Sequence, residues 1–262
     1  YEEAMADCQT MASDYSMDAD SYFLAGTVAL AMDSYDEAMA DFDAAYVDEP
    51  TYDMAIQIYQ AYVERDMEAD GTRYLEAALE TEPENAEDYC SRGRVYYYMQ
   101  DYSNAQKELI EAVNSESTEA LLLLGKVYLA SEDISNARAM YQEYAAAEGE
   151  SAGGYNGLAL CDIAEGNYSS ALTNISTGLP LADQEEMQEL LFNEIVAYES
   201  LLDFSTARQK VIEYLALYPD DEAAQKELVF LNSRTGNTSD SENSSEENTQ
   251  ESVPRETEET SQ

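Results

Sequence analysis

The chain has 262 residues, of which 56 are Asp or Glu and only 12 are Lys or Arg, so its formal net charge is −44 at pH 7. This balance argues against a nucleic-acid partner, because phosphate backbones are bound by clustered Lys and Arg side chains. The absence of His excludes an imidazole base, a histidine metal ligand and Ser–His or Cys–His nucleophile pairs. A hydrophobic fraction of 45% is too high for a wholly disordered acidic chain, and an elongated solenoid would spread the charge over more surface than a single compact core.

A four-residue phrase, in which an aromatic residue or Ile is followed three places later by Ala, recurs from the first residue onward. It begins as Tyr1-Glu-Glu-Ala4 and returns 34 residues later as Tyr35-Asp-Glu-Ala38. Further copies are Tyr102-Ser-Asn-Ala105, Ile134-Ser-Asn-Ala137, Tyr168-Ser-Ser-Ala171 and Phe204-Ser-Thr-Ala207. From Ala38 onward the alanines lie 67, 32, 34 and 36 residues apart. The long first interval predicts a degenerate copy inside it, and Gly71 stands in the Ala place there.

A second position lies twelve residues before the phrase Ala in the six copies from Ala38 onward. Two helices whose backbones cross closely need a Gly or Ala at the crossing. Four copies have a small residue there, namely Gly26, Gly93, Gly125 and Ala159, and the other two have Tyr59 and Ile195. Pro residues follow three of the repeats, at Pro50, Pro83 and Pro219. Since Pro cannot continue a helix, each predicts a turn into the next repeat.

Six complete copies in register from Ala38 onward, at a period near 34 residues, resemble the tetratricopeptide repeat. The resemblance covers residues 1 to about 231. It implies an all-α fold, a right-handed superhelical solenoid of antiparallel helix pairs. The six repeats are expected at about 19–51, 52–85, 86–117, 118–151, 152–187 and 188–220.

The two ends differ from the repeats. Residues 1–18 are expected to form the second helix of a truncated repeat, which predicts an upstream first helix in the parent protein. Residues 221–232 are expected to form a capping helix, because a solenoid needs a polar outer side at its end. Residues 233–262 are rich in Ser, Thr, Asn and Glu. They are expected to be a disordered acidic tail, since they cannot bury enough apolar area to offset the entropy of ordering.

The sequence contains no recognisable catalytic or cofactor motif. Gly153-Gly154 is an isolated pair without the Lys and Ser or Thr of a phosphate-binding loop. Asp18 and Asp20 lack the spacing of an EF-hand loop and are expected to be solvated acids at a helix start. We therefore expect no enzymatic activity, no cofactor and no metal.

The cysteines and the hydropathy pattern indicate no disulfide framework, no metal site and no membrane-spanning helix. The three cysteines are widely spaced and odd in number, which fits neither a disulfide framework nor a metal site. We expect buried free thiols that act as small apolar residues, at Cys8, Cys90 and Cys161. No stretch approaches the roughly 18 apolar residues of a membrane-spanning helix.

In tetratricopeptide proteins the first helices of successive repeats line the concave surface. Carrying this over predicts a partner-binding groove formed by Phe23, Ile56, Gln60, Arg94, Tyr97, Tyr98, Leu122, Lys126, Asn156 and Phe192. Much of this row is apolar, which a solvent-facing surface would avoid unless it were covered. The alternative is that tight curvature or the acidic tail buries part of the row.

Arg94 and Lys126 occupy equivalent places in adjacent repeats. We expect them either to bind one anionic group together, with Tyr97 and Tyr98 beside it, or to form local ion pairs with surrounding acids. Some members of the family hold acidic chaperone tails with a clamp of Lys, Asn and Arg. The inner places of that clamp are occupied here by Phe23, Ile56, Cys90 and Leu122, which argues against such a ligand.

The function implied by the resemblance is that of a non-catalytic scaffold whose groove binds a protein or peptide. Two alternatives stay open: a cell-surface or envelope assembly component of lipoprotein type, and the regulatory part of an enzyme whose catalytic domain lies upstream. The acidic, Tyr- and Met-rich repeats favour an exported or cell-surface location, although acidic cytosolic proteins have a similar composition. The sequence does not determine the oligomeric state or the identity of the partner.

Overall fold

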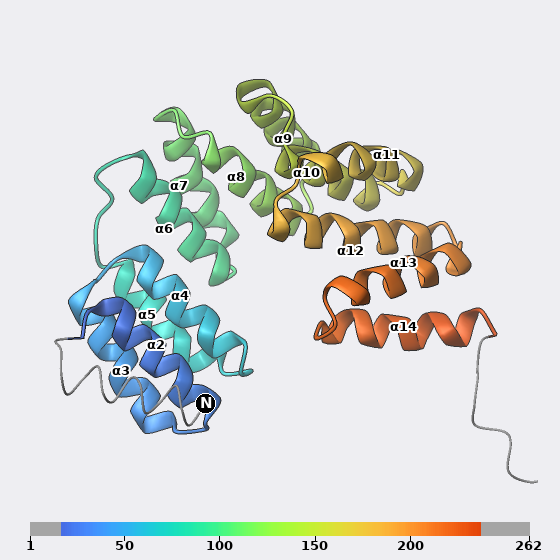
Figure 1. Ribbon diagram of the computed structural model, residues 1–262. Coiled ribbons are helices and arrows are strands. Elements are labelled where there is room, and N and C mark those ends of the chain that lie inside the picture. Colours follow the sequence, from blue (N-terminus) through green and yellow to red (C-terminus); the bar gives the residue numbers. More distant parts are fainter. Residues whose placement is uncertain (1–16, 237–262) are drawn as a thin grey trace, which may run out of the picture.

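A computed structural model describes residues 17–236 of the chain. Most of the expected helix at 1–18, including Cys8, and most of the expected acidic tail at 233–262 lie outside the described residues. The described part folds into thirteen α-helices and one short 3-10 turn, and it contains no β-strand. Successive helices pack as pairs along a curved array (Figure 1). This confirms the expected all-α, helix-pair fold.

Each pair consists of a first and a second helix joined by a short turn. The pairs are α2 (Ala19–Ala31) with α3 (Tyr35–Asp48), α4 (Tyr52–Val63) with α5 (Glu68–Ala78), α6 (Ala86–Tyr98) with α7 (Tyr102–Asn114), α8 (Glu119–Ala130) with α9 (Ile134–Glu148), α10 (Ala152–Ala164) with α11 (Tyr168–Gly178), and α12 (Gln184–Ser200) with α13 (Phe204–Leu217). The 3-10 turn Leu179–Leu181 follows α11, and α14 (Glu222–Arg234) packs on α13 where the sequence predicted a capping helix.

The turn inside every pair has the same backbone conformation. One residue, five places before the Ala of the phrase, adopts a positive φ in all six pairs: Asp33 (58°), Asp66 (57°), Gln100 (59°), Glu132 (61°), Gly166 (78°) and Leu202 (61°). The next amide donates to a carbonyl five residues back, as Ser34 N–H does to Ala29 at 2.9 Å. This is the Schellman arrangement, which ends the first helix and reverses the chain.

The crossing of the two helices in a pair depends on its small residues. A Cβ atom added to Gly26 would lie 2.7 Å from the ring of Phe42, and one added to Gly93 would lie 2.6 Å from Leu109. On the facing helices the Ala residues of the phrase are fully buried. The sequence therefore predicted correctly that the backbones approach closely at these places.

Cys90 and Cys161 are buried free thiols, and burial raises the pKa of each to about 11.

Side chains at the helix starts hold the ends of the array in place. Asp18 is the N-cap of α2 and accepts the Ser21 hydroxyl at 2.5 Å and the Ser21 N–H at 3.0 Å, and these two hydrogen bonds lower the pKa of its carboxyl group. Asp221 caps α14 in the same way through the Ala224 N–H, also at 3.0 Å. Such caps satisfy backbone donors that a helix leaves unpaired in its first turn.

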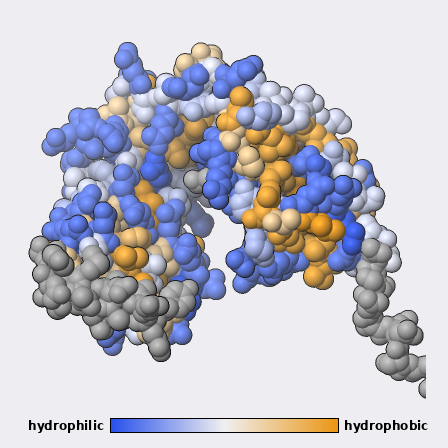
Figure 2. All heavy atoms as spheres, in the orientation of Figure 1, coloured by the Kyte–Doolittle hydropathy of each residue, from blue (hydrophilic) through white to orange (hydrophobic). Residues whose placement is uncertain are grey.

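The curvature of the array follows from which helices meet between pairs. First helices contact one another across successive pairs, α4 with α6, α6 with α8, α8 with α10 and α10 with α12. The first helices therefore line the inner, more tightly curved side of the arch (Figure 1). Figure 2 shows the same arch in space-filling form, with hydrophobic side chains reaching the surface among hydrophilic ones on its inner side.

Candidate binding groove

Two cavities lie on the inner side of the arch. The first has a volume of about 660 Å³ and is walled by α4, α6, α8, α10 and α12, with one side chain from α9. The second, also of about 660 Å³, extends to α12, α13 and the start of α14. The two share Tyr97, Lys126, Asn156, Leu160 and Glu189. We refer to the two together as the concave groove.

The structure brings together most of the residues expected in a groove. Eight of them line the first cavity, Ile56, Gln60, Arg94, Tyr97, Tyr98, Leu122, Lys126 and Asn156, and Phe192 lines the second. Phe23 lies in neither cavity, because its ring packs at 5.8 Å from that of Phe42 inside the first pair. Ile56 lines the first cavity but is itself buried, with only 5% of its surface exposed.

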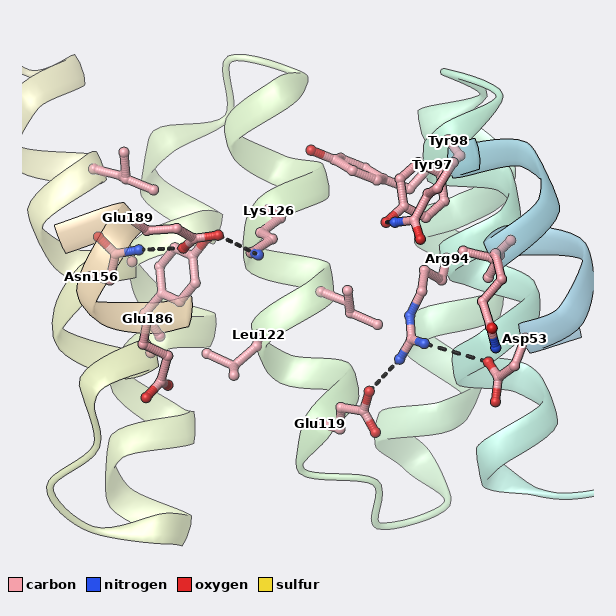
Figure 3. A pocket seen from close by; sticks show the side chains of 18 residues that line it. Asp53, Arg94, Tyr97, Tyr98, Glu119, Leu122, Lys126, Asn156, Glu186 and Glu189 are labelled. Atoms are coloured by element: carbon pink, nitrogen blue, oxygen red, sulfur yellow. Dashed lines mark hydrogen bonds and ion pairs between the residues drawn. The ribbon is translucent and has the colours of Figure 1, made fainter. Parts of the chain in front are cut away.

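Arg94 is held between two first helices on either side of its own. Its guanidinium contacts Asp53 of α4 at 3.5 Å and forms a short ion pair with Glu119 of α8 (Figure 3). With 27% of its side chain exposed, the guanidinium is largely enclosed by these acids. A planar guanidinium suits such a bridge because its N–H groups point in several fixed directions. Arg94 thus ties together three successive first helices.

Lys126 belongs to a separate polar cluster on α8, α10 and α12. Its Nζ lies 3.8 Å from Glu189 Oε1, and Asn156 donates to Glu189 Oε2 at 2.7 Å (Figure 3). Asn193 in turn donates to the Asn156 side-chain oxygen at 2.7 Å. Arg94 and Lys126 therefore have different carboxylate partners within the same groove.

The groove contains more acids than the two basic residues that stand out in the sequence. Four carboxylates line the first cavity, Asp53, Glu119, Glu186 and Glu189, against two cations, Arg94 and Lys126. The sequence reasoning missed these acids. A signal for them exists: eighteen residues before the phrase Ala stand Asp20, Asp53, Glu87, Glu119 and Glu189, with Gly153 in the remaining copy. Acids are favoured at helix starts for local reasons, so this row did not indicate a groove.

The side chain of Tyr141 lies at the floor of the first cavity, although it comes from a second helix, α9. Its ring packs between α8 and α10, where added Cβ atoms at Gly125 or Gly157 would overlap it. The side chain is 1% exposed, and its hydroxyl has no hydrogen-bond partner among the described residues. Burial raises the pKa of this hydroxyl, so it stays protonated and can both donate and accept a hydrogen bond.

A cluster of tyrosines forms the other end of the first cavity. The rings of Tyr97 and Tyr98 are edge-on with centroids 5.9 Å apart, and Gln60 donates to the Tyr98 hydroxyl at 2.8 Å. Both tyrosines are half-buried. Half-buried aromatic side chains offer a large apolar contact area together with a hydroxyl at the edge.

The described residues offer little to a metal ion or a membrane. Within residues 17–236 no group of three or more Cys, Asp or Glu side chains is placed to hold a metal. None of the helices in this range combines the length and the hydrophobicity that crossing a bilayer requires. The contacts that the groove offers are ion pairs, amide hydrogen bonds and aromatic or aliphatic packing.

Comparison with known proteins agrees with this architecture. No protein-family model and no curated protein matches the sequence. Solved structures of helical repeat proteins do match the fold. A tetratricopeptide repeat protein from Parabacteroides merdae superposes with a TM-score of 0.67 at 15% identity, over 87% of this chain and 91% of that chain. The protein therefore has the tetratricopeptide-repeat fold.

Two further solved structures show how widely this fold is used. Yeast Tom70 matches with a TM-score of 0.65 at 16% identity over 90% of this chain. The chain spans about half of the Tom70 length, 52%. PilW, described as a widely conserved type IV pilus biogenesis factor, matches with a TM-score of 0.55 at 15% identity, over 81% of this chain and 97% of PilW. At these identities the likeness concerns the fold.

Proposed function

We propose that this protein is a non-catalytic scaffold that binds a polypeptide segment of a partner in its concave groove. The observation that supports this most is a row of half-buried apolar side chains on the inner side of the arch. Tyr97, Leu122 and Phe192 come from three different first helices, and each keeps part of its surface open to the groove. Apolar surface that a fold leaves uncovered in a concave site is favourable to cover with a partner.

The polar side chains of the groove fit a polypeptide ligand as well. Gln60 is exposed and offers an amide oxygen that can accept a backbone N–H of a peptide, whereas Asn156 is buried and already bonded to Glu189 and Asn193. Arg94 serves mainly to hold the first helices together, since two carboxylates already surround it. Lys126 is more exposed, with 46% of its side chain accessible, and its ion pair is long enough to open for a ligand.

Selection of peptides from a random displayed library on the immobilised full chain tests this proposal. Selected peptides should bind the wild-type protein and lose about tenfold or more in affinity for the Tyr97→Ala/Leu122→Ala variant, because buried anchor residues dominate binding energy. The matched control is Tyr35→Ala/Leu217→Ala, which removes the same residue types from exposed places outside the groove, 48% and 61% accessible. Circular dichroism should show that both variants keep their helical content.

The outcome distinguishes the groove from the rest of the surface. Loss of binding in the groove variant alone supports the proposal. Equal binding by the wild-type protein and both variants would place the interaction on another surface. A selection that yields no binding peptide would contradict the proposal.

A further inference from the structure

Resting on this proposed function, we infer that one part of the groove is a pocket for a lysine or arginine side chain of the partner. We call it the cation pocket and define it by Leu122, Tyr141, Gly153, Gly157, Glu186 and Glu189. It lies between α8, α10 and α12, with Tyr141 of α9 beneath it. Figure 3 shows Glu186 near Leu122, and the Glu189 carboxylate turned toward Lys126.

Two glycines of α10 shape the pocket, Gly153 at its wall and Gly157 against the Tyr141 ring. A Cβ atom at Gly153 would lie 3.3 Å from Glu186 Oε1 and 3.3 Å from a Leu122 methyl group, tighter than ordinary packing. A Cβ atom at Gly157 would overlap the Tyr141 ring. Since α10 presents bare backbone here, Glu186 and Leu122 come close to Gly153 and the Tyr141 ring packs against Gly157. A larger residue at Gly153 would fill the pocket, and one at Gly157 would displace the Tyr141 ring.

The charges of the pocket favour a cation. Glu186 accepts the backbone N–H of Asp183 at 3.3 Å, and it forms no ion pair with any described residue. Glu189 has one cation near it, Lys126 at 3.8 Å. An entering ammonium or guanidinium group would gain a charge-assisted hydrogen bond to Glu186 and would be attracted by the nearby charge of Glu189. An anionic group would be repelled by the same carboxylates and by the strongly negative chain around them.

The floor of the pocket supplies an independent indication of a ligand. The Tyr141 hydroxyl is buried without a hydrogen-bond partner among the described residues. An unsatisfied buried polar group costs free energy that a ligand atom can recover. Because its pKa is raised by burial, the hydroxyl is neutral and can accept an N–H from a lysine or arginine.

The aliphatic wall distinguishes a basic side chain from a bare metal ion. Leu122 and Leu160 line the same cavity and offer methyl groups. The methylene stem of a lysine or arginine packs well on such a surface while its charged end reaches the carboxylates. A divalent metal would require several oxygen ligands in place of this apolar wall.

A library experiment with the full chain tests the inference. Four peptide libraries carry Lys, Arg, norleucine or Glu at one fixed position and random residues elsewhere, and the bound fractions are measured at 150 mM salt to screen general attraction to the acidic chain. Lys and Arg peptides should bind the wild-type protein about tenfold more tightly than norleucine peptides, in line with hydrogen bonds to charged groups.

Two variants with the same change in net charge separate the pocket from general electrostatics. Glu186→Gln/Glu189→Gln should abolish the preference for Lys and Arg over norleucine. Glu76→Gln/Glu143→Gln removes two exposed carboxylates of second helices, outside the groove, and should retain the preference. Binding to the groove with equal affinity for Lys and norleucine peptides would overturn the cation pocket and leave the proposed function standing. A preference that persists in the groove variant would also overturn it. Binding by none of the libraries would contradict both proposals.

Discussion

Gly71 of α5 lies against the backbone of Tyr59 of α4, so in this helix pair the glycine at the crossing belongs to the second helix. In three other pairs a Gly of the first helix meets a larger residue of the second, as Gly26 meets Phe42. In the α4–α5 pair the first helix has Tyr59, and Gly71 of the second helix lies against it. A Cβ atom at Gly71 would be 3.0 Å from the Cα atom of Tyr59. The degenerate repeat thus keeps the close approach by moving the glycine to the other helix.

We predict that Gly71→Ala destabilises the protein, although Ala is the better helix former. The added methyl group would press on the backbone of Tyr59, which cannot move aside as a flexible side chain could, and overpacking of this kind costs about 1–3 kcal/mol. Thermal or urea unfolding measures the change. Glu76→Ala, at an exposed place on the same helix, serves as the control for helix propensity and should be neutral or slightly stabilising. A Gly71→Ala variant as stable as wild type would show that the helices can separate without cost.

Substitutions at two equivalent turn positions with positive φ should change the stability of the protein in opposite directions. Leu202 adopts a φ of 61° with 73% of its surface exposed, so it has a strained backbone and little packing to lose. Leu202→Gly should raise the free energy of unfolding by about 0.5–1 kcal/mol, because Gly adopts this conformation without strain. Gly166→Ala, at a φ of 78° in the equivalent turn, should lower it by a similar amount. Urea unfolding of both variants checks the pair, and changes of the same sign would refute the turn argument.

The Tyr141 hydroxyl links stability to binding. Tyr141→Phe removes an unpartnered buried hydroxyl and keeps the ring between Gly125 and Gly157. We expect stability to be unchanged or raised by about 1 kcal/mol, since an unsatisfied polar group is lost. We also expect weaker binding of Lys and Arg peptides with unaltered binding of norleucine peptides. A marked loss of stability would mean that the hydroxyl has a partner in the folded protein, such as a bound water.

A pair of carboxyl groups makes the packing of α14 sensitive to pH. Burial, a hydrogen bond with Glu227 and the charge of Glu227 raise the pKa of Glu199 to about 8, and Glu227 belongs to α14. The unfolded chain would release this proton near pH 4.3. The folded state therefore holds the proton over a higher pH range, so stability should be greatest below about pH 4.3 for this group and fall as pH rises to about 8.

Urea unfolding between pH 5 and pH 9 measures this dependence. Glu199→Gln should flatten the fall in stability over that range, because Gln can donate to Glu227 at every pH. Glu76→Gln, which removes an exposed carboxyl group of α5, should leave the slope as in wild type. A wild-type slope in the Glu199→Gln variant would assign the pH dependence to other groups.

The repeat architecture could be predicted from the sequence because its causes are local and recur. Ala38 and its equivalents, the crossing glycines and the prolines between repeats each act on their own helix or on its immediate neighbour. Even the copy with Tyr59 and Gly71 was recognisable as a degenerate repeat from its place in the period. The positive-φ turns were less visible, because only Gly166 among the six is a glycine and an L-residue gives little sign of that conformation.

The groove depended on the tertiary structure. The period placed Arg94, Leu122 and Lys126 on first helices. It could not show that Arg94 pairs with Asp53 and Glu119, or that Glu186 has no cation partner among the described residues. Nor could it place Phe23 against Phe42 or bring Tyr141 beneath the cavity. Sequence by itself determined the helix pairs, because helix periodicity and close backbone crossings are written in residue types at fixed spacing. The charge and shape of the inner surface were decided only by the curvature of the whole array. This curvature sets the distances between side chains more than twenty residues apart in the sequence, and it is the summed result of packing at every junction between helices.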